Sequence, residues 1–206
     1  MNDFWIWFST GFQHILDWNG YDHILYVIAL CVLFSVKDWK KLLVLVTAFT
    51  IGHSLTLAIS VLDVLTVKQA FIEVLIPLTI MSTCIVNIFY RRFVPIAIGI
   101  GERNNSMAIN YNLNYSLALG FGFIHGMGFS YLLKSMLGRE ENILLPLLSF
   151  NLGLELGQII IVISMLLFSV FLTRFTKIKK SVEILVISTF VLLVATLLFI
   201  QRLIAL

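Results

Sequence analysis

The chain has 206 residues, of which 60% are hydrophobic and only 12% are charged, and its mean hydropathy is +1.00. This composition excludes an ordinary soluble domain and indicates a membrane protein whose main partner is the lipid bilayer. A formal net charge of +3 is too small to argue for nucleic acid as a partner.

The first segment, MNDFWIWFSTGFQ, has no basic residue before its apolar residues and no small-residue cleavage site. It therefore does not resemble a secretory signal peptide. Its pattern predicts an interfacial amphipathic helix with Trp5 and Trp7 at the level of the lipid headgroups. Trp18, Tyr26 and Trp39 are likewise expected to be anchors at the membrane interface.

Six apolar runs then predict six transmembrane helices. They cover residues 22–36, 42–61, 69–90, 114–133, 144–172 and 182–204. The first run is short, and the fifth is long enough to tilt or to extend beyond the bilayer. We find no internal repeat and no second domain, so we expect an all-α polytopic membrane protein with a single transmembrane helical domain over residues 1–206.

The basic residues predict the orientation of these helices. Ten of the 14 Lys and Arg residues flank the first, third and fifth connections between the predicted spans. The positive-inside rule then places these connections in the cytoplasm and both termini outside. The remaining basic residues are Lys68, Lys134, Arg139 and Arg202.

Several ionisable residues lie in or at the ends of the predicted spans. Such groups are costly in a bilayer and usually face a protein interior or a wet cavity, so each one is a functional candidate. Distances along each helix, at about 1.5 Å per residue, place most of them in one layer within the outer half of the bundle. The candidates are His14, Asp22, His23, His53, Glu73, His125 and Glu155.

Neighbouring residues favour a polar interior. Asn151, Glu155 and Gln158 are spaced i, i+4, i+7 and share one helix face, and Ser54 adds a hydroxyl next to His53. Glycine pairs with four-residue spacing on the fourth and fifth spans permit close helix packing. Pro77 cannot donate to the carbonyl group of Glu73, which predicts a kink and a free acceptor beside that carboxylate.

Each candidate also has a purely structural explanation. A lone membrane histidine often bonds a neighbouring helix, Glu155 could be a protonated acid bonded to an amide, and His14 could be solvated at the surface. Together, imidazoles and carboxylates on several helices form a ligand set for divalent Zn, Ni or Co. We therefore predict a metal site built from all of these candidates, with Ser54, Asn151 and Gln158 in support. Asp22 could instead orient the ring of His23.

Five blocks of the sequence carry a resemblance to a known family. The blocks are GFQHILDWNGYDHILYVIAL, TAFTIGHSLTL, IEVLIPLTI, FGFIHGMGF and LLSFNLGLELGQ. In this order they resemble the HupE/UreJ family of hydrogenase and urease accessory membrane proteins. The resemblance implies a nickel or cobalt permease of the bacterial inner (plasma) membrane that serves the maturation of nickel enzymes. By position, the residues associated with metal passage would be His14, Asp22, His23 and His125.

The chain departs from the hydrogenase-type permeases in two places. His14 stands further from the Asp22–His23 pair, and HGMGF does not continue into a second His-Gly and a Glu. This places the chain closer to the second branch of the family.

Three functions remain open from the sequence. The first is a metal permease. The alternative is an intramembrane zinc-dependent hydrolase, in which three ligands hold the metal and Glu73 or Glu155 acts as a base. The third is a metal-stabilised scaffold for another membrane partner.

Overall fold

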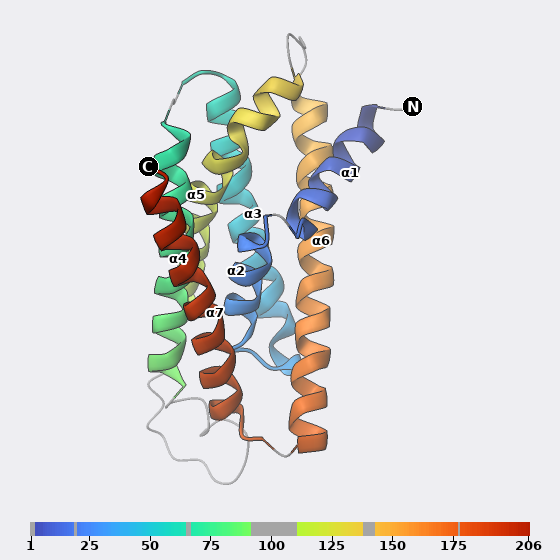
Figure 1. Ribbon diagram of the computed structural model, residues 1–206. Coiled ribbons are helices and arrows are strands. Elements are labelled where there is room, and N and C mark those ends of the chain that lie inside the picture. Colours follow the sequence, from blue (N-terminus) through green and yellow to red (C-terminus); the bar gives the residue numbers. More distant parts are fainter. Residues whose placement is uncertain (1–2, 19, 65–66, 92–110, 138–142, 177) are drawn as a thin grey trace.

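The computed structural model describes residues 3–18, 20–64, 67–91, 111–137, 143–176 and 178–206, with only the backbone at residues 111–113. These residues form an all-helical bundle (Figure 1). Its helices are α1 (Asp3–Leu16), α2 (Asp22–Cys31), α3 (Trp39–Val61), α4 (Gln69–Tyr90), α5 (Tyr111–Leu137), α6 (Leu144–Phe171) and α7 (Lys180–Ile204). A 3-10 turn, Val36–Asp38, precedes α3, and a π turn, Leu172–Thr176, follows α6.

Five of the described helices, α3 to α7, are long and apolar enough to cross a membrane. The first expected span is different, because α2 has only 10 residues. At about 1.5 Å per residue it reaches roughly half of the hydrocarbon layer. Figure 1 shows α1 running inward from the end of the bundle that holds both termini, and α2 continuing towards the other end. The structure thus confirms five of the six predicted spans, and α2 by itself is too short to be the remaining one.

The N-terminal helix is not a purely interfacial one. Helix α1 packs along α6, and Trp7 is buried instead of lying among lipid headgroups, whereas Trp5 is exposed. The close contact depends on Gly11 and Gly153, because a Cβ atom on either glycine would overlap a backbone carbonyl oxygen of the other helix. The expectation for Trp7 was wrong because these glycines let α1 dock on the bundle.

Helices α3 and α5 form a second close pair, as expected from the glycines of α5. A Cβ atom on Gly52 would overlap the carbonyl oxygen of Leu119, and one on Gly122 would overlap that of Phe49. Because these glycines have no side chains, the backbones of the two helices can approach closely. This contact holds His53, which directly follows Gly52 in α3, close to the segment of α5 that contains His125 and Gly126.

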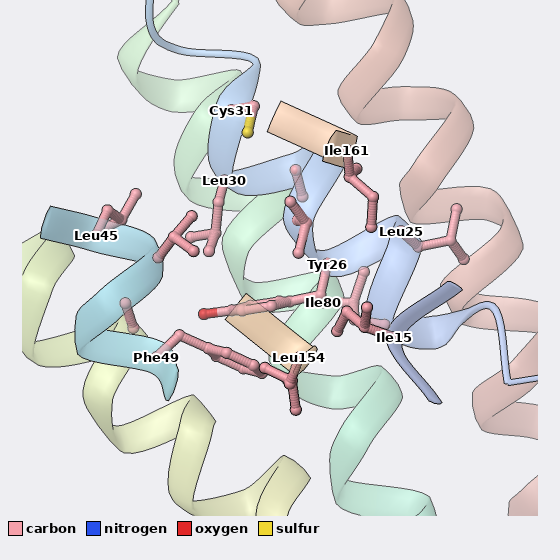
Figure 2. Packing of buried hydrophobic residues seen from close by; sticks show 14 of the residues in the cluster. Ile15, Leu25, Tyr26, Leu30, Cys31, Leu45, Phe49, Ile80, Leu154 and Ile161 are labelled. Carbon is pink, nitrogen blue, oxygen red and sulfur yellow. The ribbon is translucent and has the colours of Figure 1, made fainter. Parts of the chain in front are cut away.

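Helix α2 lies at the centre of the bundle and contacts α4, α6 and α7. Its side chains join one hydrophobic cluster with α3, α4 and α6 (Figure 2). Tyr26 is fully buried there, with its ring centroid 4.9 Å from that of Phe49, so its expected role as an interface anchor was wrong. Cys31 and Cys84 are buried and free, and buried free cysteines pack as small apolar side chains.

Four of the basic residues used to predict the orientation lie outside the described residues. They are Arg92, Arg103, Arg139 and Lys177. Both ends of the described chain lie at the same end of the bundle (Figure 1).

Candidate metal centre

Three of the candidate histidines converge from three helices. His14 lies at the end of α1, His23 at the start of α2 and His53 in the middle of α3. One nitrogen of each ring lies within 4.8 Å of a nitrogen of both others. The ring centroids of His14 and His23 are 4.6 Å apart, and that of His53 is 6.0 Å from His14 and 6.2 Å from His23. We call this set the histidine cluster.

A carboxylate fixes the ring of His23. Nδ1 of His23 lies 2.9 Å from Oδ1 of Asp22, and Oδ2 of Asp22 accepts a 2.8 Å hydrogen bond from Arg202 of α7. An ionised carboxylate only accepts, so Nδ1 carries the proton and Nε2 keeps its lone pair. This is the second-layer arrangement that orients a metal-binding histidine. The structure thus favours the orienting role for Asp22.

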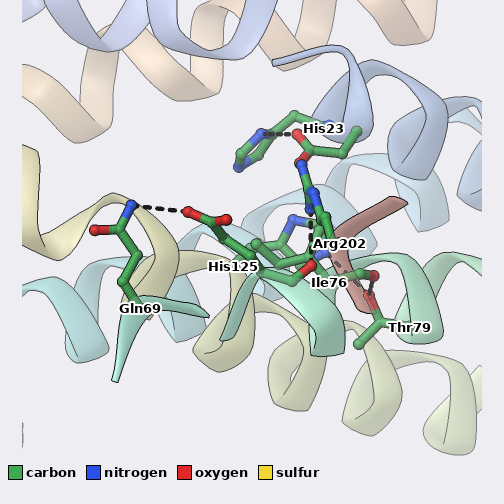
Figure 3. A network of polar contacts seen from close by, with 8 residues as sticks. His23, Gln69, Ile76, Thr79, His125 and Arg202 are labelled. Carbon is green, nitrogen blue, oxygen red and sulfur yellow. Dashed lines mark hydrogen bonds and ion pairs between the residues drawn. The ribbon is translucent and has the colours of Figure 1, made fainter. Parts of the chain in front are cut away.

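His125 of α5 adjoins the cluster, with its ring centroid 5.0 Å from that of His23. Its Nε2 lies 3.0 Å from Oγ1 of Thr79, whose hydroxyl group donates to the carbonyl oxygen of Ile76 at 2.6 Å (Figure 3). The single hydroxyl proton is therefore used, and the oxygen accepts from Nε2–H. A neutral His125 then keeps a lone pair on Nδ1.

The free nitrogen atoms of these rings are enclosed by protein. Nε2 of His14, Nε2 of His23, both nitrogens of His53 and Nδ1 of His125 are buried and make no hydrogen bond with the described residues. Buried polar atoms without a partner are costly and are normally satisfied. An ion with several open coordination positions would satisfy these lone pairs together.

Burial also keeps His14 neutral. It lowers the pKa of His14 well below the usual value, and the nearby His23 and His53 lower it further, while Asp22 opposes the shift. A neutral imidazole offers a lone pair, whereas an imidazolium cannot bind a metal.

A cavity of about 900 Å³ adjoins the cluster, and residues near both ends of the chain, such as Thr10 and Arg202, help to line it. Polar and charged side chains line part of its wall, and apolar residues such as Ile76 and Phe129 line the remainder. The polar residues are Thr10, Gln13, His14, Asp17, Asp22, His23, Glu73, His125 and Arg202. A partly polar cavity of this size can admit a hydrated ion or a small ligand.

Aromatic side chains pack against His125 of the cavity wall. The ring centroid of His125 lies 5.0 Å from that of Tyr26 and 5.2 Å from that of Phe49, and both aromatic residues are almost fully buried. Beyond them lies a smaller hollow of about 100 Å³, which Tyr26, Thr83 and Asn87 help to line. The Tyr26 ring thus lines the smaller hollow and packs against His125 of the cavity wall.

The remaining predicted site residues lie in different places. Glu73 lines the cavity and accepts a 2.9 Å hydrogen bond from Gln69. Glu155 accepts a hydrogen bond from Thr47 at 2.8 Å, at the contact between α3 and α6, and does not line the cavity. Gln158 accepts one from Thr50 at the same contact. Ser54 and Asn151 donate to carbonyl oxygens of their own helices.

Sequence reasoning missed two residues of this site, Arg202 and Thr79. Besides Asp22, Arg202 donates to the carbonyl oxygen of Glu73 at 3.0 Å, the acceptor that Pro77 leaves free. The free acceptor was expected, but its partner was not. A single Arg at the end of an apolar span was the available signal, because such charges are functional candidates by default. Thr79 had no comparable signal.

The sequence comparison decides the family. A sequence model described as HupE / UreJ protein matches residues 1–202. The chain belongs to the HupE/UreJ family. The comparisons found no match among curated proteins and none among solved structures. As a HupE/UreJ member, the chain combines a multi-pass membrane architecture with a cluster of histidines.

Proposed function

We propose that this protein is a plasma-membrane permease for a divalent transition-metal ion, nickel or cobalt, which binds at His14, His23 and His53 on its way across the bilayer. The observation that carries the proposal is the convergence of three enclosed imidazoles with unpartnered nitrogens, two of which, His14 and His23, line a partly polar cavity. Family membership supports nickel or cobalt as the cargo.

The donor set fits such an ion. Three neutral imidazoles without thiolates suit Ni, Co and Zn, whereas carboxylate and carbonyl oxygens would suit Mg or Ca. In this proposal Asp22 and Arg202 hold the His23 ring, and Glu73 attracts the cation into the cavity. Glu155 and Gln158 tie α3 to α6 and so support the position of His53.

The proposed path begins outside the cell. Both termini are placed outside by the positive-inside rule, so the cavity opens outward, and residues 1–206 act as one transmembrane domain. The ion then passes from the histidine cluster to Nδ1 of His125. Tyr26 must move aside before the ion can reach the hollow beside Asn87. Conduction requires that the ion also leaves, so binding at the cluster is moderate.

One observation favours a second candidate, the zinc-dependent hydrolase. Tyr26 and Phe49 are buried and pack against His125 of the cavity wall, which suits a site that binds and processes a molecule without passing an ion inward. Three histidines would hold Zn with one position open for water, and Glu73 on the cavity wall would serve as the base.

Transport in liposomes separates these functions. Purified protein in vesicles loaded with a metal-sensitive dye should admit Ni²⁺ or Co²⁺, and His53→Ala should abolish the influx. The control is Asp63→Asn, because Asp63 pairs with Lys134 at the exposed end of α3. An influx equal to that of empty vesicles, together with stoichiometric retained Zn, would overturn the permease in favour of the hydrolase.

A further inference from the structure

A further hollow, distinct from the small one beside Asn87, adjoins the metal cavity on the outer surface of the bundle. It has a volume of about 800 Å³ and lies between α2, α6 and α7. Among the described residues that line it, Ser164 is the one with a hydroxyl group, and the others have aliphatic, aromatic or thioether side chains. Representative residues are Ile24, Ile28, Ile160, Phe168, Val186 and Phe190. We call this hollow the α2–α6–α7 groove.

The groove follows from the unequal lengths of its helices. Helix α2 has 10 residues, whereas α6 has 28 and α7 has 25. The short α2 stands between the two long helices and contacts both of them (Figure 1). It therefore forms a floor, and α6 and α7 form the two walls.

The groove and the metal cavity share two residues of their linings, Leu16 and Trp18. Leu16 ends α1, and Trp18 belongs to the connection to α2, where its side chain is 84% exposed. A molecule that passes these two side chains would have one part among polar residues at the histidines and another part among apolar residues in the bilayer.

We propose that the metal cavity and the α2–α6–α7 groove together bind one long-chain lipid. Its anionic oxygen head enters the metal cavity, and its alkyl chain lies in the groove. The apolar lining alone does not make this lipid bind more tightly than other bilayer lipids, because an alkyl chain gains little by moving from bilayer hydrocarbon to an apolar groove. The preference for this lipid comes from its anionic head.

Asp17 and Glu73 on the cavity wall oppose an anionic head, so such a head can bind only where a metal ion attracts it, and this step depends on the proposed metal site. Three neutral imidazoles leave a divalent ion with its full charge. Asp22 and Arg202 neutralise each other as an ion pair. An oxygen anion can then occupy a coordination position that the three histidines leave open. A fatty-acid carboxylate and the phosphate of a lysophospholipid share this chemistry.

Photolabelling tests the proposal. The full-length protein with Ni²⁺ is illuminated with a palmitate analogue that carries a diazirine in its chain, and labelled residues are mapped by peptide mass spectrometry. We expect saturable labelling on α2, α6 and α7 at the groove. Unlabelled palmitate and a lysophosphatidic acid compete, whereas palmitate methyl ester does not. The stronger competitor identifies the carboxylate or the phosphate as the head.

Two matched variants on α6 provide the control. Ile160→Trp places bulk in the groove and should lower labelling by about tenfold. Ile163→Trp should leave it unchanged, because Ile163 is also exposed, at 51% against 42%, but does not line the groove. Equal labelling of both variants, or labelling spread evenly over the lipid-facing surface, would overturn the groove site.

The role of the metal is tested separately. Chelation of Ni²⁺ should weaken competition by palmitate. Labelling that is the same with and without Ni²⁺ would overturn the placement of the head in the metal cavity. Binding of Ni²⁺ itself is measured by equilibrium dialysis without lipid. If the protein does not bind Ni²⁺ in the dialysis experiment, the result counts against the proposed function. If it binds Ni²⁺ but shows no saturable labelling at the groove, the result counts against the lipid site alone.

Discussion

Replacing Asp22 by Asn tests how the site is held together. Oδ1 of Asp22 accepts from the backbone N–H of His23 at 2.8 Å and from its Nδ1, and Oδ2 accepts from Arg202. An Asn side chain has one accepting oxygen, while its NH₂ group only donates. If the oxygen faces His23, the NH₂ group meets Arg202. If the side chain is flipped, the NH₂ group meets Nδ1 of His23 and forces the other tautomer.

The expected magnitude follows from this conflict. Loss of an outer partner of a metal-binding histidine typically lowers metal affinity by about 10–100-fold. This corresponds to roughly 1.4–2.7 kcal/mol of binding free energy. The assay is competition for Ni²⁺ or Zn²⁺ between detergent-purified protein and a fluorescent chelator, with thermal unfolding measured in parallel to confirm that the variant is folded.

Asp63→Asn is the matched control, because it removes an aspartate from an exposed ion pair with Lys134 away from the cavity. Its metal affinity should equal that of the wild type. If Asp22→Asn keeps wild-type affinity, or if both variants lose the same amount, then Asp22 does not orient a metal-binding histidine and the reasoning is refuted.

Further predictions concern packing, pH and the inner closure. Gly52→Ala should lower thermal stability, because its Cβ atom would overlap the carbonyl oxygen of Leu119; an unchanged melting temperature would contradict the close α3–α5 contact. Since burial lowers the pKa of His14, this residue stays neutral in the folded protein while it gains a proton on unfolding below about pH 6.5. Its contribution to stability is therefore present above that pH and is lost as the pH falls below it, and His14→Gln should flatten the pH dependence of the melting temperature. Tyr26→Ala should raise Ni²⁺ leak into liposomes, whereas Tyr26→Phe should not; equal fluxes would show that Tyr26 does not close the path.

The meeting of the histidines could be expected from the sequence. The topology predicted from the basic residues also puts His23, His53 and His125 in the outer half of the bundle, and polar groups in one part of a membrane bundle tend to face one another. His14 was harder to place, because its helix was expected at the lipid surface. Its position depends on the contact between Gly11 and Gly153, and no pattern in a single sequence pairs two particular glycines.

Helix faces explain where the sequence reasoning failed. Asn151, Glu155 and Gln158 do share a spacing that favours one face, but Glu155 and Gln158 meet Thr47 and Thr50 of α3 and not the cavity. Periodicity shows which residues lie together and does not show what they face. The break between α1 and α2 was missed for a related reason. A fully buried short helix is as apolar as a membrane-spanning one.

The central claim is that His14, His23 and His53 bind a divalent metal ion together. Anomalous X-ray diffraction from crystals of the protein grown with Ni²⁺ or Zn²⁺ tests it most directly. The account predicts one strong anomalous peak within bonding distance of a nitrogen of each of the three rings, about 2.0–2.1 Å if the ion is Zn²⁺. A peak at another place, or three histidine rings that stay apart at saturating metal, would contradict it.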